Sequence, residues 1–293
     1  MKRAFTSREL LSLAWGLTLM FAVLPNALPH GLAASGPAWI FLLWTGLAVA
    51  GFAWAAVRPL REACILLIVF FLGNVLQGCV VASSFWQQWF RSPDTVPALR
   101  LLSMPLLKVG LALIMIAVLL WLRYRPWELF LARGELNAPV EPVRGFQIPL
   151  RWALLSVVVT IFCALILVLI SHPRPSPAAL AGALPLLPVV LLTAAMNAFA
   201  EEVMFRGALL APLDRAVGPR HAVLLTAVLF GIFHYHGIPS GCLGVVLTTL
   251  LGWFWGKCMV ETKGLLLPWL MHFVLDALIF WFIAAELTQG LKW

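Results

Sequence analysis

Three short stretches in the C-terminal half of the chain carry ionisable residues inside otherwise apolar sequence. They read "NAFAEEVMFRGAL" (197–209), "FGIFH" (230–234) and "HFVLD" (272–276). A charge at the centre of a bilayer costs roughly 2.5–3.5 kcal/mol even on lenient insertion scales, so such residues usually mark a functional site. Carboxylates and imidazoles together can activate a water and stabilise a negative oxygen, which is the chemistry of amide hydrolysis.

The spacing within each stretch predicts which side chains share a helix face. Glu201 and Glu202 are adjacent and point about 100° apart on a helix. Glu202 and Arg206 are four residues apart, which is the favourable order for an acid–base pair. We therefore predict that Glu202 pairs with Arg206 and that Glu201 faces the bundle interior.

Helical rise predicts that the three stretches meet at one depth. Glu201 lies thirteen residues before Asp214, where a polar turn begins, and His234 lies fourteen residues after Arg220, where the turn ends. At 1.5 Å per residue, both side chains lie about 20 Å from the same surface. Asp276 reaches the same level on the last apolar segment, and His272 lies one turn away on the same face. This convergence predicts a site built from several helices.

The composition of the chain requires a membrane to position these helices. Of 293 residues, 62% are hydrophobic and 11% are charged, against about 25% charged in soluble domains. The net charge of +8 would suit nucleic acid in a soluble protein. Here the basic residues cluster between apolar runs, which is the positive-inside pattern, so no nucleic-acid partner is expected. The five cysteines are scattered and form neither a disulfide framework nor a CxxC metal motif.

Apolar runs of helical length predict an all-α polytopic transmembrane bundle of eight or nine spans. The candidate spans are 10–29, 39–57, 64–84, 101–121, 152–170, 186–210, 222–235, 241–256 and 265–285. The runs at 222–235 and 241–256 are short, and eight spans with one re-entrant segment stay possible. With the N-terminus in the cytoplasm, fifteen of the twenty Lys and Arg residues lie inside. The five exceptions are Arg91, Arg100, Lys108, Arg174 and Lys292.

The longest polar connection divides the chain into three parts. We expect a four-span N-terminal membrane region at 1–122, a cytoplasmic connection at 123–151 and a five-span catalytic bundle at 152–293. The connection, "RYRPWELFLARGELNAPVEPVRG", predicts a short amphipathic surface helix followed by a loop. The polar residues of the first half, Asn74, Gln77 and Lys108, are expected to make helix-packing hydrogen bonds or, for the lysine, to reach the membrane surface.

The ordered motifs EExxxR, FxxxH and HxxxD resemble those of the CPBP family of intramembrane glutamate proteases. That family includes the CAAX prenyl endopeptidases and the bacterial Abi and bacteriocin-processing proteins. The resemblance covers about 185–285, and 1–150 carry no matching motif. It implies a CPBP-like C-terminal core, no cofactor, no metal, and a membrane-associated peptide or protein as substrate.

The resemblance also implies a role for each matching residue. Glu201 would be the general base that activates water, and His234 would hold and polarise that water. His272 and Asp276 would form the oxyanion-stabilising side. Because an ionised carboxylate repels an oxyanion, Asp276 either carries a proton or serves to orient His272. The residues expected to support the site are Glu202, Arg206, Phe230 and Asn197.

Two other classes of function stay open from the sequence. Glu201, His234, His272 and Asp276 could be ligands of a metal-dependent membrane hydrolase, although no HExxH motif is present. A non-catalytic scaffold, immunity or transport protein could also keep buried acids and histidines. The sequence shows no sign of the internal symmetry that is usual in transporters. The expected location is the inner membrane of a bacterium. The substrate, any prenyl group on it and the oligomeric state are not predicted.

Overall fold

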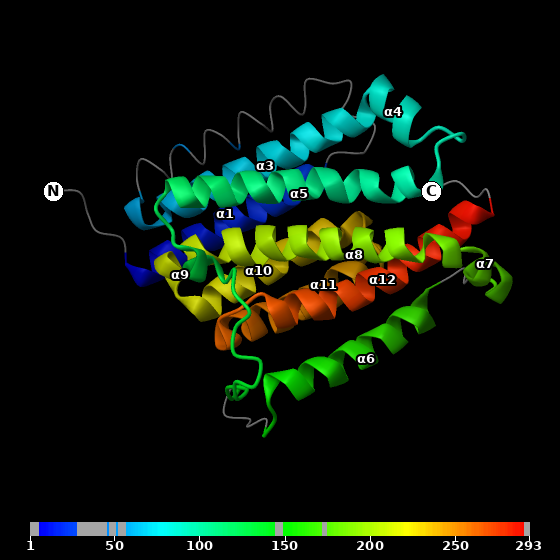
Figure 1. The fold of residues 1–293 in the computed structure, drawn as a ribbon. Coiled ribbons are helices and arrows are strands. Elements are labelled where there is room, and N and C mark those ends of the chain that lie inside the picture. The colour runs from blue at the N-terminus through cyan, green and yellow to red at the C-terminus, as the bar shows by residue number, and fades with distance from the viewer. Residues whose placement is uncertain are drawn as a thin grey trace. The chain divides into compact units, whose positions relative to one another are not determined.

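Helices make up almost all of the regular structure in the part of the chain that can be described. The computed structural model in Figure 1 describes residues 6–27, 57–143, 149–171 and 175–289, with Gly46 and Gly51. Over these residues there is no strand, and one isolated bridge joins Pro139 to Arg151. The chain is therefore an all-α polytopic membrane protein, as predicted. Its longer helices are α1 (Ser7–Ala27), α3 (Arg61–Ala82), α5 (Pro97–Trp121), α6 (Trp152–Ile170), α8 (Leu187–Glu202), α10 (Pro219–Phe233), α11 (Gly241–Thr262) and α12 (Leu266–Thr288).

Six helical segments in the described part are long and apolar enough to cross a membrane. They are Arg58–Ala82, Pro97–Trp121, Trp152–Ile170, Leu184–Val217, Gly241–Thr262 and Leu266–Thr288. The expected span at 39–57 lies outside the described residues, so the total of eight or nine stays a prediction. Helix α10 has 15 residues, or about 22 Å, which is short of the roughly 30 Å hydrocarbon core. The expectation that 241–256 is short was wrong, because α11 has 22 residues and continues through polar sequence to Thr262.

In the described residues of the connection after α5, 123–143 and 149–151, the predicted amphipathic helix is absent. A single 3-10 turn, η2 (Pro126–Leu129), stands in its place, followed by irregular chain. Arg123 and Phe130 on either side of the turn have φ of 68° and 56°. These left-handed conformations interrupt a right-handed helix at both ends.

The chain divides into two compact units. One consists of residues 1–82, 114–129 and 203–257, and the other of 83–113, 130–202 and 258–293. Each unit combines segments from both sides of the 123–151 connection. The three-part division expected from the sequence stays a prediction.

In the unit that contains α8 and α12, these two helices lie side by side, and α6 and the short α7 (Pro177–Gly182) pack on α12 (Figure 1). Small buried residues, among them Ala183 and Ala284, let the helices approach closely. The Trp269 indole on α12 donates a hydrogen bond of 3.1 Å to the Ala195 carbonyl on α8. This contact sets the register in which the polar residues of the two helices meet.

In the other unit, the chain changes its helical pitch directly after α8. Residues Val203–Ala208 (η4) form a π-helical turn, with the Leu209 amide bonded to the Met204 carbonyl five residues back. Helix α9 (Leu210–Val217) follows and packs against α10. Close approach of α10 and α11 requires Gly231, because a Cβ there would lie 1.9 Å from Thr249 Oγ1.

Candidate active site

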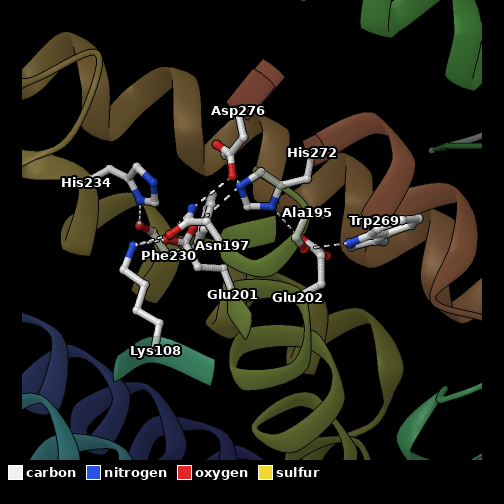
Figure 2. A network of polar contacts seen from close by, with 10 residues as sticks. All are labelled: Lys108, Ala195, Asn197, Glu201, Glu202, Phe230, His234, Trp269, His272 and Asp276. Carbon is white, nitrogen blue, oxygen red and sulfur yellow. Dashed lines mark hydrogen bonds and ion pairs between the residues drawn. The ribbon is translucent and has the colours of Figure 1, made fainter. Parts of the chain in front are cut away.

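Helices α8 and α12 bring five polar residues together in the membrane region of one unit. Asn197, Glu201 and Glu202 come from α8, and His272 and Asp276 come from α12 (Figure 2). Every one of these side chains is buried. The convergence of Glu201, His272 and Asp276 that helical rise predicted is therefore present.

The imidazole of His272 lies between the carboxylates of α8. Its Nδ1 is 2.8 Å from Glu202 Oε1, and its Nε2 is 3.6 Å from Glu201 Oε2. Because a carboxylate accepts, Nδ1 carries the proton, and Nε2 accepts in the neutral ring and donates in the imidazolium. Glu202 therefore orients His272, a role that the sequence analysis considered for Asp276.

Asp276 has a different main partner. The Asn197 amide donates 2.9 Å to Asp276 Oδ2 and 3.3 Å to Glu201 Oε1. Asp276 Oδ1 lies 3.6 Å from His272 Nε2, beyond hydrogen-bond distance. Asn197, expected to support the site, thus connects Asp276 with Glu201.

Lys108 on α5 joins the same network (Figure 2), and the sequence analysis did not assign it to the site. Its Nζ lies 2.5 Å from Glu201 Oε1 and 2.8 Å from Asn197 Oδ1. The signal available in the sequence was a lone charge in the apolar run 101–121. A lysine at that depth needs a carboxylate, and the chain separation of 93 residues hid which one.

Glu202 and Arg206 were predicted to pair because they are four residues apart. Glu202 ends α8, and Arg206 lies in the π-helical turn that follows, in the other compact unit, so this pairing stays a prediction. The fully buried guanidinium stacks on aromatic rings of its own unit, 4.0 Å from the Phe230 centroid and 5.4 Å from that of Trp255. Phe230 therefore supports Arg206 by a cation–π contact.

His234 begins a 3-10 turn at the end of α10, in the same unit as Phe230. Its Nδ1 lies 2.8 Å from the Phe230 carbonyl, and the two rings are 4.2 Å apart. A carbonyl only accepts, so Nδ1 donates and Nε2 can accept from a water. The predicted approach of His234 to Glu201 stays a prediction.

A metal ion would need several of these side chains as ligands. Over the described residues, no group of three or more His, Cys, Asp and Glu side chains is arranged to hold one. Glu201 already faces the Lys108 ammonium, and Glu202 holds His272 Nδ1. With these partners, the two carboxylates are better arranged for proton transfer than for binding a cation.

Fold and site together define a class: a helical integral membrane protein with buried carboxylates around an imidazole. Residues 183–278 match the family model "Type II CAAX prenyl endopeptidase Rce1-like". The match agrees with the resemblance to the CPBP/CAAX protease family that the motifs of this segment indicated. The match includes Glu201, His234, His272 and Asp276, and it suggests intramembrane endopeptidase activity. No curated protein and no solved structure matches the chain.

Proposed function

We propose that this protein is a glutamate-type intramembrane endopeptidase that hydrolyses a peptide bond of a membrane-associated polypeptide. The observation that carries the proposal is the approach of Glu201 Oε2 to His272 Nε2, at 3.6 Å, in the segment that matches the protease family. A base and an electrostatic stabiliser at one buried place are what amide hydrolysis requires.

In the proposed reaction, Glu201 takes a proton from a water as the water oxygen attacks the carbonyl carbon. The carbonyl oxygen becomes an oxyanion, and the Nε2–H of a His272 imidazolium donates to it. Glu201 then returns the proton to the leaving amine as the C–N bond breaks. His234, by its resemblance to the family pattern, would hold the attacking water through Nε2.

The contacts around His272 and Glu201 support these roles. The Glu202 carboxylate on Nδ1 stabilises the imidazolium, as the carboxylate does in a serine-protease triad. The Lys108 ammonium offsets the negative charge of Glu201, and the Asn197 amide donates hydrogen bonds to Glu201 and Asp276. The remaining features proposed for the protein are an N-terminus in the cytoplasm and a bacterial inner membrane.

The proposal is tested with the full chain expressed at native level and with Glu201→Gln, which keeps the shape of the side chain and removes the base. Quantitative proteomics of membrane fractions should show polypeptide fragments that occur with the wild type and are absent with the variant. Phe162→Leu, at an exposed site on α6, is the matched control. If every fragment persists in Glu201→Gln while the variant inserts normally, the protein is not a glutamate-type protease.

A further inference from the structure

A cavity of about 150 Å³ lies at the start of α5 and the end of α12, within one compact unit. Both helices also contribute to the proposed active site, α5 through Lys108 and α12 through Asp276. Met104 is one turn before Lys108, and Phe280 is one turn after Asp276. Its lining is Arg91, Arg100, Leu101, Met104, Pro105, Phe280, Ile283 and Leu287.

The two arginines of this cavity make no ion pair with any carboxylate in the described part of the chain. Arg100 donates through Nη2 to the Ser92 carbonyl. Its Nε is buried and has no hydrogen-bond partner among the residues that the structure describes. Arg91 and Arg100 are also two of the five positive residues that depart from the positive-inside pattern. Arg91 is exposed and Arg100 is half-buried, and together they make this cavity positively charged, which favours an anionic ligand.

The neighbouring helix places this cavity at the level of the lipid headgroups. Helix α4 (Ser84–Phe90) directly precedes Arg91 and exposes Phe85 and Trp89 by 61% and 59%. Aromatic side chains of this kind gather at the boundary between hydrocarbon and water. Arg100 lies in the first turn of α5 and Leu287 in the last turn of α12, so both membrane segments end here.

We propose that this cavity binds an anionic phospholipid, with its phosphate on Arg91 and Arg100 and an acyl chain along the apolar wall. The other six lining residues are apolar. An acyl chain would pack against such a wall, whereas a free phosphate ion would not need it. Guanidinium groups bind phosphate oxygens with charge-assisted hydrogen bonds. The surrounding bilayer supplies such a ligand without a separate partner. The proposal goes beyond the proposed protease function and does not depend on it.

The test measures lipid binding by the purified full chain in nanodiscs of phosphatidylcholine, using titrated fluorescent phosphatidylglycerol. The double variant Arg91→Gln/Arg100→Gln should bind phosphatidylglycerol at least about tenfold more weakly than the wild type, since each tenfold step is about 1.4 kcal/mol. Met104→Trp, which fills the cavity and keeps the charges, should weaken binding similarly. Arg133→Gln removes an exposed positive charge from the same unit and should leave binding unchanged.

Other results would overturn the assignment. Equal binding by the wild type and the double variant would remove the arginines from the site. An effect of Arg133→Gln as large as that of the double variant would mean general surface charge. Unchanged binding by Met104→Trp would exclude the cavity. Competition by millimolar inorganic phosphate would identify a free anion as the ligand, and binding of phosphatidylcholine with the same affinity would exclude recognition of the anionic headgroup.

Discussion

The ammonium of Lys108 lies 2.5 Å from the carboxylate of Glu201, a residue 93 positions later in the chain. The side chain of Glu201 is 7% exposed and that of Lys108 is 29% exposed. Glu201, the carboxylate that we propose as the catalytic base, thus lies beside a counter-ion inside the membrane.

Lys108→Met should destabilise the protein by on the order of 3 kcal/mol, because it leaves a buried carboxylate without its cation. The estimate is at the lower end for buried pairs, since Lys108 is partly exposed. Thermal unfolding in detergent measures the loss. The double variant Lys108→Met/Glu201→Gln should recover much of it, and failure to recover would show that the pair does not account for the effect.

Glu202→Gln should lower kcat by about 10²-fold or more with little change in KM, because general acid–base and electrostatic contributions are of that size. The amide can no longer stabilise an imidazolium at His272 Nδ1. Steady-state cleavage of a substrate found by the fragment comparison provides the measurement. Glu202→Asp should retain part of the activity, whereas equal loss in both variants would mean that packing, and not charge, is what matters.

Phe230→Leu should destabilise the protein by about 2 kcal/mol, the size of a desolvated cation–π contact. The ring lies 4.0 Å from the buried Arg206 guanidinium, and a leucine keeps the apolar character but not the π face. Thermal unfolding compared with Phe162→Leu, at an exposed position, isolates the effect. Equal melting temperatures for the two variants would contradict the contact.

We expect the stability of the protein to depend on pH through Glu128, which lies at the membrane surface. Its pKa is lowered from 4.5 by a hydrogen bond from the Arg125 amide and by the Arg215 guanidinium, which lies 2.6 Å away. A lowered pKa stabilises the folded state at pH values above the unfolded pKa, and this contribution is lost as the pH falls below about 4.5. Glu128→Gln should therefore lower the melting temperature at pH 7 and have a smaller effect at pH 3. An equal effect at both pH values would show that the charge of Glu128 does not cause the stabilisation.

Chelators should leave proteolysis unchanged. Glu201 already faces an ammonium, and the Asn197 amide occupies Asp276, so neither carboxylate is arranged as a metal ligand. Activity after treatment with 1,10-phenanthroline, together with elemental analysis of the purified protein, checks this. Loss of activity that zinc restores would favour the metal-dependent alternative.

The sequence by itself determined the membrane class, the helical fold and the acids and histidines of interest, because these depend on composition and on helical spacing. Glu201, His272 and Asp276 could be placed at one depth, since rise per residue is constant along a helix. The contact between Glu202 and His272 Nδ1 could not be predicted, because spacing within one helix does not say which side chain of another helix a carboxylate meets. The role of Lys108 also required tertiary structure, since only the packing of helices decides which buried carboxylate meets a distant ammonium.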